Sequence, residues 1–299
     1  MLIDILSRGP QLYSTQSLLK AAQVRGHQVQ IIDHSKCHLL VGDQKDIQIY
    51  YEGQVHKLPQ AVIPRIGASI TSHGADVIRH LQQSGKVYCL TGAEALLLAR
   101  DKFRSLQLLA GAGLPVPRSL VYGQIANPSL AIEFLGGFPM VFKLMESTHG
   151  AGVILIHSLS ALETTIQHFS RTGVRFMLQE FIEEAGGADI RVIVVGKEVV
   201  AFMERQAQDG EFRSNLHRGA SARTIPLSVD EMQMAIKAVQ ILGLEVAGVD
   251  LLRSHRGPLI IEVNASPGLE GIERVTGINV AAQMIKWVEK RVHDKRMGT

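Results

Sequence analysis

The sequence predicts an α/β fold, with an N-terminal domain built on a mostly parallel sheet and two α+β lobes after it. Strand-like and helix-like segments alternate over roughly the first ninety residues, a pattern that indicates parallel strands connected by helices. A proline-containing segment at residues 114–118 then interrupts the pattern, and paired strands dominate the remainder. At 299 residues, the chain is long enough for two or three packed lobes rather than one small core.

The N-terminal domain is expected to span residues 1–95, with its elements defined by apolar runs and the turn residues between them. Strands are expected at 3–6, 29–32 and 61–67, helices at 15–25 and 75–84, and a hairpin joining 47–51 to 54–57. The first strand is not followed by G-x-G-x-x-G, which disfavours a dinucleotide-binding domain. Ligands of parallel sheets bind at the carboxyl ends of the strands. The candidate rim residues there are Ser7, Arg8, Arg65 and Gly67.

A domain boundary is expected after a long amphipathic helix at residues 92–110. The segment 114–118 should form an extended linker, because each proline blocks helix and constrains the residue before it. We therefore predict a connecting helix and linker over 96–117, a central lobe over 118–184 and a C-terminal lobe over 185–299. Central-lobe strands are expected at 120–122, 139–144, 153–156 and 176–181, with helices at 128–135 and 159–170. The C-terminal lobe should contain strands at 189–195 and 198–205, an irregular polar loop to 225, helices at 229–242 and 280–292, and a hairpin between these helices.

Composition argues against several classes of protein. The formal charge of +3 is small and scattered, and aromatic residues make up 5%, so nucleic-acid binding is not expected. The cysteines, Cys37 and Cys89, are too few and too far apart for a disulfide framework or a cysteine metal site. An acid, Asp4, interrupts the apolar run at the N-terminus, which favours a first strand over a signal peptide. No apolar run approaches the ~18 residues of a membrane span, so we expect a cytoplasmic protein without a membrane partner.

The C-terminal hairpin is the strongest candidate for a metal site. Two apolar strands flank the turn Ser254-His-Arg-Gly257, so Asp250 should lie opposite Glu262. Glu262 and Asn264 are two residues apart, and their side chains should leave the same face of the strand. Burying unpaired carboxylates is costly, whereas two carboxylates and an amide suit Mg²⁺ shared with substrate phosphates. The alternative is a pair of exposed acids on an edge strand.

Lys143 and the loop after it are candidates for binding phosphate. Lys143 lies in an apolar strand, where lysine is rare unless it is paired or serves an anion, although its stem could also reach a sheet edge. The following loop contains Gly150 and Gly152, and glycines allow backbone amides to approach phosphate oxygens. It is not a Walker A loop, because no Gly-Lys-Ser/Thr is present. Taken alone, such a loop is usually only a turn.

Three further segments carry polar side chains that could belong to the same site. Gln179–Ile182 ends a strand with a polar pair followed by two apolar residues, which could contact a purine. Asp189 and Arg191 share one strand face, and Arg205 lies on the next strand; the alternative is a cross-strand ion pair. The loop 212–219 concentrates basic and polar residues that suit phosphate or carboxylate, or simply form a solvated loop. No nucleophile motif such as G-x-S-x-G and no H-E-x-x-H is present, so phosphoryl transfer is the implied chemistry.

Taken in order along the chain, these motifs resemble the ATP-grasp superfamily of carboxylate–amine ligases, over about residue 92 to the end. Within that superfamily, the whole chain is most similar to the RimK-type α-L-glutamate ligases. The segments that carry this closer resemblance are Ile5-Leu-Ser-Arg8, Ala61-Val-Ile-Pro-Arg-Ile-Gly67, Ala99-Arg-Asp-Lys102, Phe212-Arg-Ser-Asn-Leu-His-Arg-Gly219 and Val263-Asn-Ala-Ser-Pro-Gly-Leu-Glu-Gly271. The resemblance implies an ATP-grasp fold, in which two α+β lobes clasp ATP after a Rossmann-like pre-ATP-grasp domain.

The resemblance also implies roles for individual residues. It places ATP against Lys102, Lys143, Ser147, Gly150, Gly152, Glu180, Phe181, Asp189, Arg213, Ser214 and Asn215. Among these, Glu180 and Phe181 would line the adenine, and Asp189 would reach the ribose side. Asp250, Glu262 and Asn264 would hold Mg²⁺ or Mn²⁺, with two ions expected. Lys143, Arg205 and Arg213 would be catalytic, with the arginines stabilising the transferred phosphoryl group and the acyl phosphate.

The activity implied by the resemblance is ATP-dependent addition of L-glutamate to the C-terminus of a ribosomal small-subunit protein, formation of poly-α-glutamate, or both. A homo-oligomer, tetrameric by family resemblance, is also implied. Two alternatives stay open. Other ligases of the superfamily act on carrier proteins, coenzymes or glutathione precursors. A nucleotide-binding regulator without turnover would be a different class, but such a protein has no need of Lys143, Asp250, Glu262 and Asn264 together.

Overall fold

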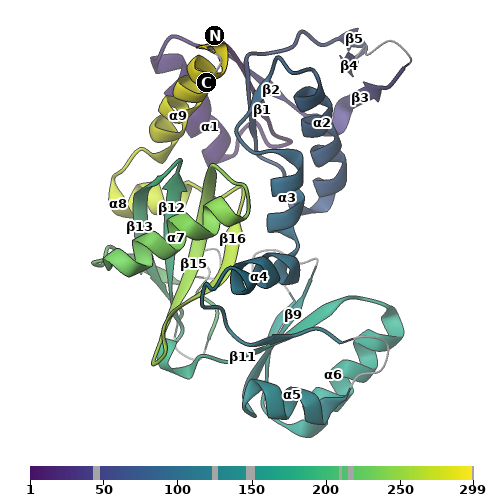
Figure 1. The fold of residues 1–299 in the computed structure, drawn as a ribbon, viewed down its shortest axis with the longest axis vertical. Helices are drawn as coiled ribbons and strands as arrows, with labels where there is room; N and C mark the ends of the chain where they lie inside the picture. Colours follow the sequence, from purple (N-terminus) through teal and green to yellow (C-terminus); the bar gives the residue numbers. More distant parts are fainter. Residues whose placement is uncertain (43–47, 123–126, 146–151, 209–210, 215–218, 298–299) are drawn as a thin grey trace.

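The computed structural model describes residues 1–42, 48–122, 127–145, 152–208, 211–214 and 219–297. Figure 1 shows three bodies along the long axis, with the N-terminal sheet at the top, a second sheet in the middle and a smaller lobe at the bottom. The two chain ends lie near each other at the top (Figure 1). The predicted α/β class is confirmed. In the described part of the chain, no helix is both long and apolar enough to cross a bilayer.

A parallel sheet of four strands, in the order β2-β1-β6-β7, forms the centre of the N-terminal domain. Its strands are β1 (Leu2–Leu6), β2 (Gln28–Ile32), β6 (Ala61–Pro64) and β7 (Tyr88–Cys89), and its helices are α1 (Tyr13–Val24) and α2 (Thr71–Gln83). Ile3 and Ile5 belong to the core that contains α1, whereas Leu6 and Val62 belong to the core that contains α2. Both faces of the sheet are therefore covered, which explains why the two central strands, β1 and β6, are apolar apart from the buried Asp4, whereas β2, at the sheet edge, carries the exposed Gln28 and Gln30.

A separate antiparallel sheet of three short strands projects from this domain (Figure 1). It comprises β3 (Cys37–Leu40), β4 (Gln48–Tyr51) and β5 (Gln54–Val55). The predicted hairpin corresponds to β4 and β5, although Ile47 lies outside the described residues. Sequence patterns did not predict β3, because its pairing with β4 depends on a partner in space rather than on its own periodicity.

The predicted helix at 92–110 is two helices, α3 (Ala93–Arg100) and α4 (Lys102–Gly111). Asp101 separates them with an extended backbone, φ −81° and ψ 101°, and its carboxylate accepts a hydrogen bond from the Arg104 amide at 3.1 Å. Aspartate is a preferred N-cap because it satisfies an amide that the first helical turn leaves without a partner. The break places Lys102 in the first turn of α4, a helix that lies just above the lower lobe in Figure 1.

The central lobe is an antiparallel sheet in the order β10-β9-β11-β8, covered on one face by two helices. Its elements are β8 (Ser119–Leu120), α5 (Pro128–Leu135), β9 (Met140–Leu144), β10 (Val153–Ile156), α6 (Leu159–Thr172) and β11 (Phe176–Glu180). Phe142 and Phe176 stack in its core with ring centroids 5.1 Å apart. These bounds agree closely with the predicted ones.

The C-terminal sheet has five antiparallel strands in the order β14-β13-β12-β15-β16. Its elements are β12 (Ala188–Val195), β13 (Glu198–Gln206), β14 (Ser221–Arg223), α7 (Val229–Ile241), β15 (Val246–Ser254), β16 (Gly257–Asn264), α8 (Glu270–Thr276) and α9 (Val280–Met297). Short 3-10 turns occur at His34–Lys36, Ala68–Ile70 and Glu183–Ala185. Sequence patterns missed β14 and α8, which are shorter than the windows that reveal periodicity.

The apolar cores join the N-terminal and C-terminal sheets but leave the central lobe largely separate. Two clusters contain residues of both sheets, as with Val62 and Val249 in one and Ile5 and Met203 in the other. The central lobe has its own cluster. A fourth, small cluster, Leu106, Met145 and Met177, links the central lobe to α4. Among the described residues, the upper two bodies therefore pack as one unit, with the lower lobe attached through α4 and the linker.

Candidate active site

The register of the C-terminal hairpin brings the three predicted metal ligands to one face. Asp250 pairs directly with Glu262, and Gly248 pairs with Asn264, so the side chains of all three ligands leave the same side of the sheet. The turn lies at Ser254–Gly257 as predicted. A bulge between Asp250 and Leu251 shifts the register just beyond this pair, a device that often re-aims side chains beside functional sites. Asp250 is buried and Glu262 is exposed.

Asp250 belongs to a buried network of alternating charges. Arg191 on β12 grips both oxygens of Asp250, with Nη2 2.7 Å from Oδ2, and Arg205 Nη2 lies 3.1 Å from the same oxygen. Arg205 also binds both oxygens of Asp189, at 2.7 and 2.5 Å. Burial alone would raise the pKa of Asp250, but Arg191 and Arg205 outweigh it and hold that pKa below its ordinary value. The Asp250 carboxylate is therefore ionised and held in place.

Asp189 and Arg205, which were predicted to contact ATP and the transferred phosphoryl group, bind each other in this structure. The cross-strand ion pair that was the alternative interpretation is present, because Asp189 pairs in register with Arg205. It is a buried, bidentate pair rather than an exposed one, so its loss would leave a desolvated charge. The carboxylate of Asp189 points at Arg205, not at open space. A ribose contact by Asp189 is untested.

The donor set fits a hard divalent cation. Asp250 and Glu262 supply carboxylate oxygens, and the Asn264 amide oxygen is oriented by the Ser266 amide, which donates to it at 3.1 Å. Magnesium uses one or two carboxylates and completes its shell with water and phosphate oxygens. Within the described residues, no group of three or more His, Cys, Asp and Glu side chains is arranged for a metal. The predicted set has two carboxylates and an amide, which matches a site completed by substrate.

Lys102 and Lys143 reach the neighbourhood of Glu262 from two other elements. Lys143 on β9 donates from Nζ to Gln179 Oε1 at 2.7 Å, and Lys102 on α4 donates to the carbonyl oxygens of Leu144 and Met145, each at 3.1 Å. Burial lowers the pKa of Lys143 to about 8, and the charge of Glu262 opposes that shift. Burial likewise lowers the pKa of Lys102, again opposed by Glu262. Two cations and an acid from three segments therefore converge.

The pKa of Lys143 predicts a loss of ATP use at alkaline pH. The ammonium attracts phosphate while it is protonated, below about pH 8, and this attraction disappears as the pH rises past that value. We expect kcat/KM for ATP to fall above about pH 8, since this parameter reports the free enzyme. Replacing Lys143 with arginine keeps the charge and should remove this fall. An unchanged alkaline limb in Lys143→Arg would assign the titration to another group.

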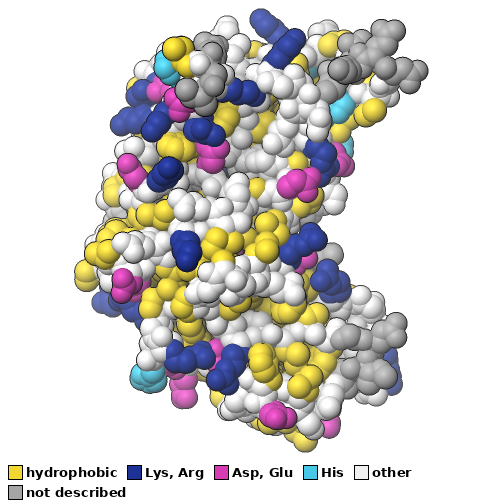
Figure 2. Space-filling view, in the orientation of Figure 1, with side chains coloured by type: hydrophobic (Ala, Val, Ile, Leu, Met, Phe, Trp, Pro, Cys, Tyr) yellow, Lys and Arg dark blue, Asp and Glu magenta, His cyan; other side chains and the backbone are white. Residues whose placement is uncertain are grey.

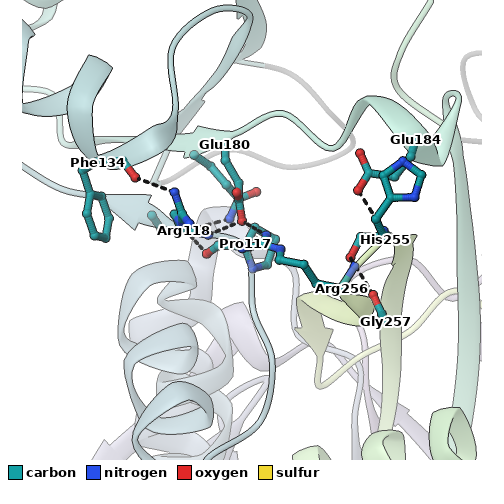
Figure 3. Close-up of polar contacts among 11 residues, drawn as sticks. Pro117, Arg118, Phe134, Glu180, Glu184, His255, Arg256 and Gly257 are labelled. Carbon is teal, nitrogen blue, oxygen red and sulfur yellow. Dashed lines mark hydrogen bonds and ion pairs between the residues drawn. The ribbon is translucent and has the colours of Figure 1, made fainter.

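Glu180, the residue before Phe181, lies at the junction of the central lobe, the linker and the C-terminal hairpin (Figure 3). The Glu180 carboxylate accepts a hydrogen bond from the Arg118 amide at 2.7 Å and forms an ion pair with Arg256 at the hairpin tip. The Glu180 amide in turn donates to the Arg118 carbonyl at 3.0 Å. Beside this contact, the His255 amide donates to Glu184 Oε1 at 3.0 Å. The segment predicted to line the adenine therefore coincides with the connection between lobes.

The pair Glu180–Arg256 is expected to contribute little to folding. Arg256 is about half exposed, and exposed ion pairs are typically worth about 0–1 kcal/mol. Replacing Arg256 with alanine should therefore change the free energy of unfolding by less than about 1 kcal/mol. Urea denaturation of Arg256→Ala beside the wild type measures this change. A larger loss would mean that the hairpin tip fastens the central lobe to the rest of the molecule.

Arg213 connects the C-terminal lobe to the central lobe. Its Nη1 donates to the Val153 carbonyl at 3.1 Å, and its guanidinium pairs with Glu211 at 2.6 Å and lies 5.5 Å from the centre of the Phe212 ring. Ser214 is buried beside Asp189. These contacts place Arg213 beside Val153, the first residue of β10. Its predicted contact with phosphate is untested.

Three of the residues predicted to contact ATP belong to segments that the structure does not describe. Ser147, Gly150 and Asn215 lie outside the described residues. Gly152 has φ +71°, and a Cβ at this position would lie 2.5 Å from Leu144 Cδ1, so the turn into β10 requires glycine. Glycine is therefore required at position 152 by the backbone and by Leu144, whether or not the loop binds phosphate.

One residue of this neighbourhood was not among the predicted site residues. Arg100, at the end of α3, is close enough to Glu262 to be affected by its charge. Its position directly before Asp101-Lys102 was the sequence feature that could have identified it as a site residue.

Two small surface hollows, of about 210 and 180 Å³, lie away from the candidate site. One is at the β13–β14 edge and the other is beside β7 and α9, and neither is lined by a predicted site residue.

Comparison with known families accounts for nearly all of this chain. The RimK PreATP-grasp domain matches residues 1–96, and the RimK-like ATP-grasp domain matches residues 99–288. The chain belongs to the RimK-like ATP-grasp family. It is 49% identical to a probable alpha-L-glutamate ligase of Cellvibrio japonicus, over 97% of this chain and 96% of that one. It is 48% identical to probable alpha-L-glutamate ligase 1 of Hahella chejuensis, over 100% and 98%.

Solved structures of low sequence identity confirm the ATP-grasp fold. The ATP-grasp ligase PsnB, complexed with a minimal precursor, Mg and ADP, has a TM-score of 0.74 at 20% identity and covers 98% of both chains. The RimK domain protein ATP-grasp of Sphaerobacter thermophilus has a TM-score of 0.71 at 21% identity, over 96% and 99%. D-alanine–D-alanine ligase of Bacillus anthracis complexed with ATP gives 0.70 at 14%, over the full length of both. The family match and the relatives of 48–49% identity make the chain an ATP-dependent ligase of the α-L-glutamate ligase family.

Proposed function

We propose that this ligase adds L-glutamate to the C-terminus of a ribosomal small-subunit protein, or extends poly-α-glutamate, through an acyl phosphate. The observation that carries the proposal is that Lys102 on α4 and Lys143 in the central lobe both lie close enough to Glu262 in the C-terminal lobe to be affected by its charge. Cations from one side and a carboxylate from the other suit a triphosphate bridged to a divalent metal. The names of the relatives at 48–49% identity support glutamate as the amino donor.

The reaction has two displacements. A carboxylate oxygen of the acceptor attacks the γ-phosphorus of ATP, the bond to the β,γ-bridging oxygen breaks, and ADP leaves. The amine of glutamate then attacks the acyl carbon, loses a proton and displaces phosphate, which forms the amide. Lys102 and Lys143 would bind the phosphates and offset the charge that gathers on them. Arg205 and Arg213 are proposed to stabilise the transferred phosphoryl group and the acyl phosphate.

The remaining assignments of the ATP site are part of the same proposal. Mg²⁺ or Mn²⁺, held by Asp250, Glu262 and Asn264, would supply positive charge to the β- and γ-phosphate oxygens. Glu180 and Phe181 would line the adenine at the junction of the lobes. The glycine-rich segment would cover the phosphates and exclude water, which otherwise hydrolyses an acyl phosphate. PsnB structures that hold Mg, ADP and a precursor support a metal and a peptide acceptor here.

The test of this proposal is ADP release measured with and without each substrate, combined with intact mass of the acceptor. We expect ADP release to require both glutamate and an acceptor, and the acceptor to gain repeated glutamyl increments. Candidate acceptors are the small-subunit ribosomal proteins and glutamyl peptides. ADP release that needs neither substrate would contradict the ligase reaction. ATP binding without any ADP release would favour the nucleotide-binding regulator.

A screen of amino acids and acceptors by mass spectrometry distinguishes the proposed reaction from the other enzymatic alternative, a ligase that uses a different acceptor. Ligases of the superfamily that act on carrier proteins, coenzymes or glutathione precursors would show product only with those acceptors. The same experiment shows how many glutamates are added. Cytoplasmic location, expected from the sequence pattern, and a tetrameric assembly, implied by the family resemblance, remain proposals, and the mass of the native particle in solution tests the second.

A further inference from the structure

Three arginines gather where the N-terminal sheet meets the loop after the metal-site strand. Arg8 follows β1, Arg65 follows β6, and Arg100 ends α3. All three contact residues 65–69 or belong to that segment. Arg8 Nη2 donates to Ser69 Oγ at 2.7 Å, and Arg100 Nη2 donates to the Ile66 carbonyl at 2.8 Å. The carboxyl ends of β1 and β6 therefore carry a cluster of guanidinium groups, at the edge where parallel sheets bind ligands.

Neutral groups are the partners of all three side chains. Arg65 Nη2 donates to the Pro267 carbonyl at 2.7 Å, and the acceptors of Arg8 and Arg100 are a hydroxyl and a carbonyl. Among the residues that the structure describes, none of the three forms an ion pair. Arg79, in the same domain, pairs with both Asp76 and Glu94. Arginines without an acidic partner are common where water solvates them. The extent of burial therefore decides whether the missing acidic partners are costly here.

Burial makes two members of this cluster, Arg65 and Arg100, costly unless a ligand binds, whereas Arg8 is exposed. Burial lowers the pKa of Arg65 to about 10, and it also lowers the pKa of Arg100, so both charged groups have lost much of their contact with water. Arg65 remains protonated at neutral pH. A desolvated cation without an acid is unfavourable, which applies above all to Arg65, and an anion that arrives from outside would offset this cost. The carbonyl and hydroxyl partners hold the guanidinium groups in position without neutralising them.

The cluster borders the predicted metal site. The Pro267 carbonyl that accepts from Arg65 belongs to the loop that directly follows β16, three residues after Asn264. Arg100 is close enough to Glu262 to be affected by its charge. The same loop is tied to α1, since the Leu269 amide donates to Ser14 Oγ at 3.0 Å. The arginines therefore lie on the N-terminal side of the place where the γ-phosphate is proposed to react.

We propose that Arg8, Arg65 and Arg100 form a carboxylate receptor that binds a glutamyl unit next to the acyl phosphate. This inference rests on the proposed function. Guanidinium forks match planar carboxylates with paired, charge-assisted hydrogen bonds. A glutamyl unit carries carboxylates that take no part in the bond being formed, either on free glutamate or on the C-terminal glutamate of an acceptor. Binding them here would orient the reacting group and would select glutamate over uncharged amino acids.

Kinetic constants of arginine variants test the receptor. Arg8→Gln is the first variant, because Arg8 is exposed and its loss should not affect folding. Arg65→Gln is the second, and Arg65→Lys, which keeps the charge but loses the fork, replaces it if the glutamine variant does not fold. Arg79→Gln is the matched control. We expect KM for the carboxylate substrate to rise about 10- to 100-fold, the loss of one or two charge-assisted hydrogen bonds, with KM for ATP unchanged.

The substrate whose KM changes identifies the source of the carboxylate. A rise in KM for glutamate assigns the receptor to the amino donor, and a rise for the acceptor assigns it to the peptide C-terminus. The donor assignment also predicts that discrimination between glutamate and glutamine falls in the variants. Unchanged KM values for both substrates in folded Arg8→Gln and Arg65 variants would overturn the inference while leaving the ligase reaction intact.

Calorimetric binding of glutarate, a dicarboxylate that lacks an amine, decides the question even if glutamate is not a substrate. The titration uses the full chain with a non-hydrolysable ATP analogue and Mg²⁺. We expect glutarate to bind the wild type and Arg79→Gln alike, and at least about tenfold more weakly to the Arg8 and Arg65 variants. Equal affinity in all four proteins, or no binding to the wild type, would contradict a carboxylate receptor. A wild type that binds glutarate but never ligates glutamate would refute only the proposed function.

Discussion

Replacing Glu262 with glutamine is expected to lower kcat/KM about 100- to 1,000-fold, the scale seen when one preorganised electrostatic group is removed from a transition state. The glutamine keeps the shape of the side chain but loses the negative charge that would hold the metal beside Lys102 and Lys143. Glu262 is exposed, so the melting temperature should not change, since surface substitutions alter stability by about 0.5 kcal/mol or less. Steady-state ADP release and a thermal melt measure the two effects.

Glu270→Gln is the matched control for this experiment. Glu270 is a partly exposed acid on α8 that pairs with Arg274 at 2.7 Å, and it has no predicted role in the site. It should retain activity close to that of the wild type. Raising the magnesium concentration should partly restore Glu262→Gln, because the defect is in metal binding. Full activity in Glu262→Gln at low magnesium would remove Glu262 from the proposed metal site.

Replacing Asp250 with alanine is expected to destabilise the protein by about 3–5 kcal/mol, the cost of leaving buried charges without their partner. Arg191 and Arg205 both bind Asp250, and the three residues lie on neighbouring strands of one sheet, β12, β13 and β15. Turnover should also be lost, because Asp250 is a proposed metal ligand. Urea denaturation of Asp250→Ala and of the wild type measures the difference in the free energy of unfolding. Asp76→Ala, which breaks an exposed ion pair, is the control and should change this free energy by less than about 1 kcal/mol.

The pH dependence of stability offers a second check on the Asp250 network. The pKa of Asp250 is held below its ordinary value in the folded protein, so its contribution is present above the unfolded pKa and is lost as the pH falls through the folded value. The wild type should therefore lose its advantage over Asp250→Ala in acid. An advantage that persists at low pH, or a small destabilisation at neutral pH, would mean that water reaches the two arginines.

Much of the fold could be predicted because local chemistry and tertiary structure agree. The apolar runs of β1 and β6 are buried on both faces, and the hairpin turn at Ser254–Gly257 lies where the turn residues place it. The predicted register of Asp250 with Glu262 follows from that turn, since a tight turn determines which residues face each other. Elements that depend on distant partners, such as β3 and β14, or on one cap, such as the break at Asp101, were not predicted.

The candidate site divides in the same way. Residue types along the chain were enough to predict a family, an ATP-grasp fold and a set of ligands on one strand face, because these depend on order and spacing. Spacing could not show that the carboxylate of Asp189 faces Arg205 rather than open space, nor that Glu180 pairs with Arg256. These contacts depend on which strands become neighbours and on where the hairpin tip meets the linker.

The sequence by itself determined the family, the α/β class and the identity of the oxygen and cationic groups, since motif order survives without coordinates. Only the tertiary structure decided that Lys102 and Lys143 lie within reach of the charge of Glu262, because the three residues come from segments that no local pattern relates. It also decided that Arg8, Arg65 and Arg100 gather beside the metal-site loop without acidic partners among the described residues. The physical reason is that burial and electrostatic pairing are properties of position in space, whereas periodicity reports only which face of an element is apolar.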